Sequence, residues 1–306
     1  DDIEFLLKEA KKQLILNDKN QSIIHIFNHN YIVDGKIFVE EPIGVYANLL
    51  THEMTFITTL KNNLRNINQA FIDCDIEIER LFSRIFALGV ELFNNNSLDH
   101  GSVLIDLGFE KTSIGLFKNL ALVHSTTFPF GTNHITKDIS KVCSLSLDEA
   151  NNIMNNIDFS LKNNQDIFDK NNYLKDNYFI NSNFRKISKQ LILDIIKARL
   201  NEITDKLKEQ LNIPGFDSNS GINYLLVVEN LNLLNIESYF IDFFEPSIKK
   251  NHNDVMQDQD KDLKKFASCK GALKIITDGW ETEAIPKISD RNIGKIGLLA
   301  KIFGNQ

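Results

Sequence analysis

The chain has 306 residues, about two domains' worth at roughly 150 residues per domain. Hydrophobic residues make up 42% and charged residues 25% of it, which allows a buried core and excludes a disordered polymer. The net charge of -7 excludes a general nucleic-acid binder, because such proteins present a basic face to phosphates. Three scattered cysteines without a C-x-x-C spacing predict neither a zinc site nor disulfides. We expect a globular protein of a reducing, cytosolic compartment.

The first 75 residues are expected to form an α+β unit. Apolar residues at helical spacing predict a helix over residues 3–16. Alternating patterns predict strands at residues 22–28 and 51–59, followed by a helix at 60–69. The apolar run at residues 70–74 is interpreted as a short buried strand.

The middle of the chain carries the densest strand pattern. Helical periodicity covers residues 76–93 and gives a broad apolar face. Residues 102–107, 112–117 and 120–128 are then expected to form three successive antiparallel strands joined by tight turns. A buried strand is predicted further on, at residues 224–228.

Helices are expected between these strands and after them. Residues 135–142 and 147–154 predict two short helices, the second opened by a capping box of Ser146 and Glu149. A long helix is predicted over residues 184–211, and a helical run begins near Leu233. The charged residues at 254–265 are interpreted as a solvated face, and residues 280–291 as a linker.

The last residues form an amphipathic pattern that suits a membrane surface. No apolar run reaches the roughly 18 to 20 residues that span a bilayer. Residues 292–303 instead predict a short helix with an apolar face beside positive charges, which can lie among lipid headgroups. Packing of this helix on its own domain is the alternative. The residues expected to bind a membrane are Ile293, Lys295, Ile296, Leu299, Lys301, Ile302 and Phe303.

The turn after the first strong strand is the most informative candidate site. Asp106 ends the strand, Gly108 permits a tight turn, and Thr112 begins the next strand. Such a hairpin can expose amide donors and the Thr112 hydroxyl to a phosphate while the Asp106 carboxylate holds a hydrated metal ion. An ordinary turn without a ligand is the alternative. Zinc binding by His25 and His29 is not expected, because a four-residue offset along a strand separates them.

Several segments together resemble a known family. SVLIDLGFEKTSIGLF at residues 102–117, with Gly131 and ITKDI at 135–139, resembles the second phosphate hairpin and following helix of actin-like ATPases. HIFNHNYIVDGKIFVEEPIG at residues 25–44 is similar to the inserted subdomain 1C of the FtsA family of bacterial division proteins. LDEANNI at 147–153 and IKARLNEI at 196–203 also resemble helices of that family.

The resemblance implies an α/β fold, namely the two-lobe, ribonuclease H-like fold of actin-like ATPases with an inserted 1C subdomain. Family members carry further residues before 1C, including a first phosphate hairpin, so the sequence is expected to be N-terminally incomplete. The implied division is 1C at residues 1–75, the remainder of 1A at 76–101, 2A at 102–131 and 215–280, 2B at 132–214, and a linker with the amphipathic helix at 281–306.

The resemblance also assigns a nucleotide site. Asp106, Gly108 and Thr112 match the family hairpin that holds ATP and Mg, with Asp106 on the metal side, and Arg199 and Glu202 match the helix on the nucleoside side. A solvated helix face explains Arg199 and Glu202 equally well.

The sequence also departs from the family's nucleotide site. Phe109 and Glu110 replace two family glycines, and Glu229-Asn230 replaces a later glycine pair. Weak or lost ATP binding is therefore expected.

By resemblance, the expected function is a division adaptor and not an enzyme, at most with a weak or degenerate ATPase activity. It would tether FtsZ filaments to the cytoplasmic face of the inner membrane at the division site and recruit divisome proteins. Its partners would be the FtsZ tail at 2B, further copies in filaments, division proteins through 1C, and anionic lipid. The alternatives are an ATPase or kinase of the superfamily and a pilus-assembly protein of the same fold.

Overall fold

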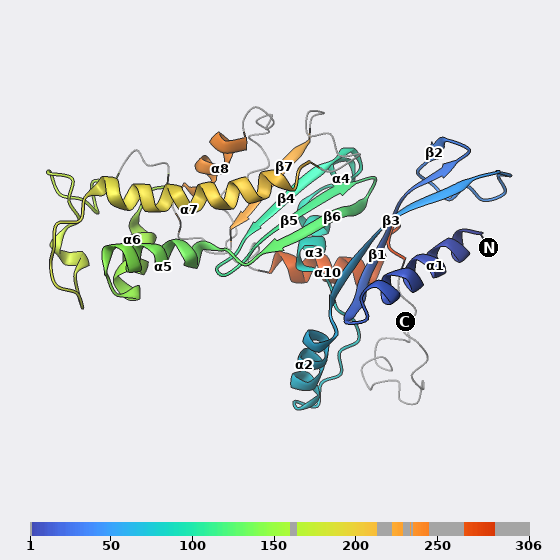
Figure 1. Ribbon diagram of the computed structural model, residues 1–306, viewed down its shortest axis with the longest axis horizontal. Coiled ribbons are helices and arrows are strands. Elements are labelled where there is room, and N and C mark those ends of the chain that lie inside the picture. The colour runs from blue at the N-terminus through green and yellow to red at the C-terminus, as the bar shows by residue number, and fades with distance from the viewer. Residues whose placement is uncertain are drawn as a thin grey trace.

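The computed structural model describes residues 2–159, 164–212, 222–228, 233, 235–244 and 266–284. Their strands form two sheets, one of three strands in the order β2-β1-β3 and one of four in the order β6-β5-β4-β7. The three-stranded sheet lies toward one end of the molecule, and most of the helices lie around and beyond the four-stranded sheet (Figure 1). No helix among the described residues is long and apolar enough to cross a membrane.

The N-terminal unit is built as the periodicity predicts. It contains α1 (Asp2–Asn17), β1 (Gln21–Val33), β2 (Lys36–Phe38), β3 (Leu50–Leu60) and α2 (Lys61–Ile72). Strand β1 pairs antiparallel with both β2 and β3, and two irregularities interrupt its register with β3. The predicted helix and both predicted strands are confirmed, and the strands are longer than expected because paired backbone groups extend beyond the alternating stretches.

Two predictions for the next residues are wrong. Residues 70–74 form no buried strand, because α2 continues to Ile72 and leaves Phe71 and Ile72 exposed. A short apolar run fits a helix as well as a strand, and here it extends the helix. The helix expected over 76–93 is α3 (Arg84–Leu92) alone.

The four-stranded sheet is the centre of the fold. Strands β4 (Ser102–Leu107), β5 (Thr112–Lys118) and β6 (Ala121–Phe128) are antiparallel, as predicted. Strand β7 (Asn223–Val228) pairs parallel to β4, so the ends of both strands lie at the same edge.

Alternate residues of β4 enter two different cores. Val103 and Ile105 belong to a core shared with α5 (Thr132–Cys143), α6 (Leu147–Asn156) and α7 (Lys189–Glu209). Helix α8 (Ile236–Phe244) closes the same core. The sequence periodicity predicts each of these helices, although α7 begins at Lys189 and not at residue 184, and the capping box of α6 is confirmed.

The opposite core contains Leu104, α3 and α10 (Ala267–Asp278). Figure 1 shows α3 and α10 together beneath the sheet. Gly271 makes their close approach possible, since a Cβ at this position would lie 1.8 Å from the Ala87 carbonyl oxygen. The short elements α4 (Asn95–His100) and η1 (Asp176–Tyr178) complete the described helices.

Residues 280–284 are not a free linker, contrary to the prediction. Phe27 and Glu283 form an antiparallel bridge, and the Ala284 amide donates to the Ile26 carbonyl at 2.9 Å. The Trp280 ring N–H and the Thr282 hydroxyl both donate to the Leu120 carbonyl. This short segment therefore ties β1 to the turn between β5 and β6.

Candidate functional site

The predicted hairpin joins β4 and β5 as a tight turn. Asp106 lies opposite Ser113 near the end of the ladder, and the Gly108 amide donates to the Lys111 carbonyl at 2.9 Å. The turn itself is therefore confirmed.

The hairpin carbonyls cover the N-terminus of α5. The Thr132 amide donates to the Gly108 carbonyl at 3.0 Å, and the Asn133 amide donates to the Phe109 carbonyl at 2.9 Å. Gly131 permits this approach, because a Cβ there would lie 2.4 Å from the Phe109 oxygen. Backbone donors that a helix N-terminus could offer to a phosphate are thus used within the chain.

The flanking amides of this turn also have partners. The Gly131 amide donates to the His134 ring nitrogen Nδ1 at 3.2 Å, and the His134 amide donates to the Gly131 carbonyl at 3.0 Å. All four amides of residues 131–134 are therefore hydrogen-bonded.

The Thr112 hydroxyl, which was expected to face a phosphate, is hydrogen-bonded within the chain. The side chain is buried, and its hydroxyl donates to the Phe130 carbonyl at 2.6 Å. A buried hydroxyl needs an internal partner, and Phe130, just after the end of β6, supplies one.

Asp106 forms an ion pair with an arginine of the same chain. Arg84, the first residue of α3, donates from Nε and Nη2 to the two carboxylate oxygens at 2.6 and 3.2 Å. The aspartate side chain is 7% exposed and the arginine side chain 50% exposed. Both oxygens that a metal ion could use accept hydrogen bonds from Arg84.

Glu110 lies beside the first turns of α5. Its carboxylate accepts a hydrogen bond from the Asn133 side chain, and Lys137 Nζ lies 3.3 Å away. The Asn133 hydrogen bond, followed by the contacts with Lys137, lowers the pKa of Glu110. The negative charge is thereby fixed at the helix end that would attract an anion.

Arg199 and Glu202 lie together on α7, one turn apart. Arg199 donates to both carboxylate oxygens of Asp138 at 2.7 and 3.1 Å and to Glu202 at 2.5 Å. The hydrogen bonds to Asp138 raise the pKa of the guanidinium. The Arg199–Asp138 ion pair joins α7 to α5. Neither the family resemblance nor the solvated-face alternative had assigned this role to Arg199.

The predicted residues thus form two groups, linked through α5. Lys137 contacts the hairpin side and its neighbour Asp138 contacts α7. The sequence interpretation missed Arg84, because no spacing in the sequence relates a residue at the start of α3 to the end of β4. No group of three or more His, Cys, Asp or Glu among the described residues could hold a metal ion. The membrane-binding residues and Glu229-Asn230 lie outside the described residues.

A second notable site lies where α5 and α6 meet residues 179–186. Glu149 is fully buried and accepts the backbone N–H groups of Ser146, Ile180, Asn181 and Ser182 at 2.6 to 2.9 Å. The Ser182 hydroxyl also donates to it at 2.6 Å. A carboxylate saturated by donors in this way fixes one conformation of the loop.

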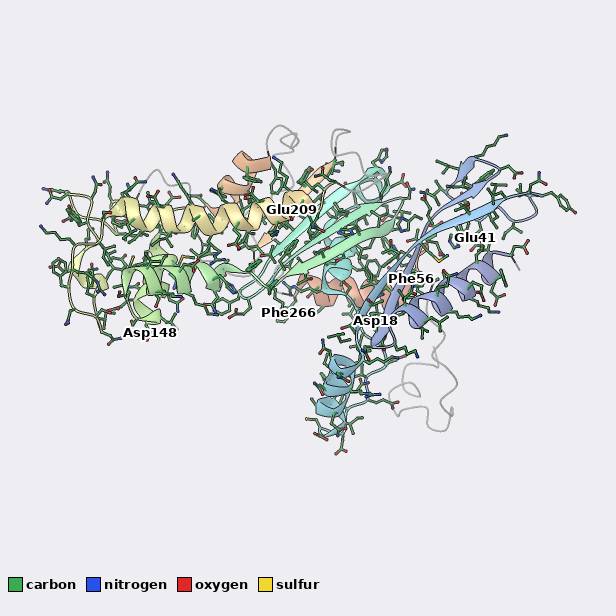
Figure 2. The ribbon with its side chains drawn as sticks, viewed as in Figure 1. Asp18, Glu41, Phe56, Asp148, Glu209 and Phe266 are labelled. Atoms are coloured by element: carbon green, nitrogen blue, oxygen red, sulfur yellow. The ribbon has the colours of Figure 1, made fainter. Side chains whose placement is uncertain are left out.

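Around this buried carboxylate the surface is apolar. Val142, Leu147, Ile180 and Phe184 are exposed, and the Phe184 ring contacts Phe179. Two cationic residues, Arg185 and Lys186, directly follow Phe184 in the chain. Arg185 donates to the Ser144 carbonyl. Figure 2 shows Asp148 at this end of the helical region, far from the three-stranded sheet.

Two family models match the chain. The one described as cell division protein FtsA matches residues 103–214, and the one described as the SHS2 domain inserted in FtsA matches residues 1–58. Together they cover more than half of the 306 residues.

Curated relatives agree with these matches. The cell division protein FtsA of Neisseria meningitidis is 27% identical over 242 residues, which are 72% of this chain and 53% of the relative. FtsA of Bacillus subtilis is 26% identical over 219 residues, covering 70% of this chain and 48% of the relative. FtsA of Agrobacterium fabrum is 22% identical over 215 residues, again covering 70% and 48%. The chain spans about half the length of the curated relatives it matches.

Solved structures establish the fold. MreB 5 of Spiroplasma citri bound to AMPPNP has a TM-score of 0.52 at 19% identity, covering 72% of this chain and 66% of that one. The PilM-PilN type IV pilus biogenesis complex has a TM-score of 0.57 at 14% identity, covering 92% of this chain and 73% of that one. At these identities the likeness concerns the fold alone, which is the predicted actin-like fold. The two family models and the curated relatives show that the chain belongs to the FtsA family of cell division proteins.

Proposed function

We propose that this protein is a cell division adaptor that tethers FtsZ filaments to the cytoplasmic face of the inner membrane and recruits other division proteins. The observation that carries the proposal is the match of both FtsA family models to one chain, in separate segments that fold as an α+β unit and as a sheet with covering helices. The pilus-assembly alternative rests on the shared fold alone.

The membrane contact is proposed for the last sixteen residues. Apolar residues on one face of this segment can enter the headgroup layer, and its positive charges can face anionic lipid. Residues 280–284, which end six residues before this segment, are anchored on β1.

Deletion of residues 291–306 is expected to abolish binding to anionic liposomes. The deletion removes the whole apolar face together with Arg291, Lys295 and Lys301, whereas residues 280–284 and their contacts remain. Co-sedimentation with vesicles of phosphatidylglycerol and phosphatidylethanolamine measures the effect. Neutral phosphatidylcholine vesicles should bind the full chain less, because surface charge contributes about 1 kcal/mol per basic residue. Unchanged co-sedimentation of the deleted chain would sink the proposal.

The FtsZ tail is proposed to bind the apolar surface of 2B around Phe184. Exposed apolar side chains beside cations suit a peptide that carries both apolar and acidic residues. The buried Glu149 network supports this surface from below, so its shape is set before a partner arrives.

Phe184→Ala is expected to weaken binding of an FtsZ C-terminal peptide by about tenfold, a typical loss when a central aromatic contact is removed. Fluorescence anisotropy with a labelled peptide measures the change. Phe266→Ala is the matched control, since Phe266 is 54% exposed against 57% for Phe184 and lies well apart from Asp148 at the far end of the helical region (Figure 2). Equal affinities of both variants would exclude this surface.

The 1C unit is proposed to contact neighbouring copies in filaments and further division proteins. Its hairpin and following loop expose Ile37, Val39, Ile43 and Tyr46 at one end of the molecule. Contiguous exposed apolar side chains of this kind are typical of interaction surfaces.

ATP with Mg is proposed to bind weakly or not at all. The charge of Glu110 beside α5 and the internal hydrogen bond of Thr112 both oppose a phosphate at this hairpin. Any role of nucleotide would then be in assembly more than in turnover.

A further inference from the structure

The hairpin between β4 and β5 already holds one charge of each sign where a nucleotide would bring a metal ion and a phosphate. We propose that Arg84 and Glu110 are built-in substitutes for that metal ion and that phosphate, so that the hairpin and α5 keep their closed arrangement without nucleotide. The proposal rests on the actin-like fold and on these contacts. It stands or fails independently of the membrane and FtsZ proposals.

The cation side of the substitution is the Asp106–Arg84 pair. An almost buried carboxylate needs a compensating charge, and Mg²⁺ would meet that need through carboxylate oxygens. Here the guanidinium occupies both oxygens in a bidentate pair at 2.6 and 3.2 Å. A metal ion would have to displace a charge-assisted contact that is among the stronger hydrogen bonds in proteins.

The anion side is Glu110 at the first turns of α5. A helix N-terminus attracts an anion through its free amides and its dipole. The four amides of residues 131–134 are all hydrogen-bonded. The Glu110 carboxylate places a negative charge beside this helix end, where it accepts hydrogen bonds from the side chains of Asn133 and Lys137. A phosphate would find the four amides of residues 131–134 already hydrogen-bonded and Lys137 already paired with Glu110.

Both substitutes act on the same structural unit. The Gly108 and Phe109 carbonyls accept from α5, Glu110 contacts α5 from the same turn, and Arg84 brings α3 to the end of β4. The residues present therefore do not fit a bound Mg–ATP. They fit a hairpin that is held in place by the chain itself.

Arg84→Ala is the first test, with Mg²⁺ alone as the probe. The wild type should show no change in Tm between MgCl₂ and NaCl at equal ionic strength. Arg84→Ala should have a lower Tm, and Mg²⁺ should raise it again, because Asp106 is then left without its cation. The double variant Arg84→Ala/Asp106→Asn should lose this response. A response to Mg²⁺ in the wild type equal to that in Arg84→Ala would overturn the proposal.

Glu110→Gln tests the anion side in a variant that should fold, since Glu110 is exposed. Its affinity for inorganic tripolyphosphate, measured by calorimetry, should rise by about fivefold or more once the like charge beside Lys137 is removed. Glu209→Gln is the matched control, because Glu209 is an exposed glutamate paired with Lys206 on α7. Equal tripolyphosphate affinities of the wild type and Glu110→Gln would contradict the proposal that Glu110 replaces a phosphate. Micromolar binding of Mg–ATP by the wild type would contradict it as well.

Discussion

Glu149→Gln is expected to lower the free energy of unfolding by about 3 kcal/mol or more, because a buried carboxylate that accepts several hydrogen bonds is replaced by a group with one acceptor oxygen. Glu149 accepts four backbone N–H groups and one hydroxyl, and three of the amides belong to residues 180–182. The amide nitrogen of glutamine would also face those donors. Urea unfolding measures the loss, and hydrogen exchange at residues 180–182 should show it locally.

Asp148→Asn is the matched control for this prediction. Asp148 also lies in the first turn of α6, but its side chain is exposed and takes no part in the network. We expect a change within about 0.5 kcal/mol, as is usual for surface substitutions. Similar losses in both variants would mean that helix charge, and not the buried network, stabilises this region.

Glu149 also gives the stability a pH dependence. Burial alone would raise its pKa, but the hydrogen bonds from Ser182, Ser146 and Asn181 outweigh burial and lower it. Because the folded pKa lies below the unfolded one, the contribution is complete above the ordinary carboxyl pKa. It is lost as the pH falls below that value, and Glu149→Gln should lose less stability on acidification than the wild type.

Glu283→Leu is expected to lower the free energy of unfolding by about 3 to 5 kcal/mol, the usual effect of removing one partner of a buried charged pair. Glu283 is buried, contacts Arg80, and accepts from Nδ1 of the fully buried His25 at 2.6 Å. The other ring nitrogen of His25 accepts the Ser83 amide at 2.8 Å, which places the histidine proton on Nδ1. Without Glu283 that buried N–H has no acceptor.

The loss should be local before it is global. Residues 280–284 should separate from β1, so the amides of Asn28 and Ala284, which bond across this junction, should exchange faster with solvent. Glu281→Leu is the control, because Glu281 lies two residues away and its side chain is exposed. It should leave amide exchange and Tm nearly unchanged. Protected amides in Glu283→Leu would show that the backbone bridge alone holds the segment.

The sequence predicted the hairpins and helices well because their determinants are local. The alternation in residues 102–128 gave the three antiparallel strands, and Ser146 with Glu149 gave the start of α6. It failed at residues 70–74, where a short apolar run has no period of its own. It also failed at residues 280–284, whose partner β1 lies far earlier in the chain.

For the candidate site, the sequence found the hairpin but not its contacts. Asp106, Gly108 and Thr112 lie at the predicted hairpin, but the Thr112 hydroxyl donates to Phe130 and Asp106 pairs with Arg84. From the sequence we also predicted that the Glu110 charge opposes a phosphate. It gave no indication that Asn133 and Lys137 hold that charge against α5.

By itself, the sequence determined the short-range order of strands and helices, the hairpin and the family. Periodicity and turn chemistry act between residues close in the chain, so the residue pattern itself predicts them. Only the tertiary structure decided which charges meet, since His25 and Glu283 lie 258 residues apart and Arg84 and Asp106 lie on different elements. Burial then makes such pairs obligatory, because an ionised group taken out of water needs a partner that no local pattern specifies.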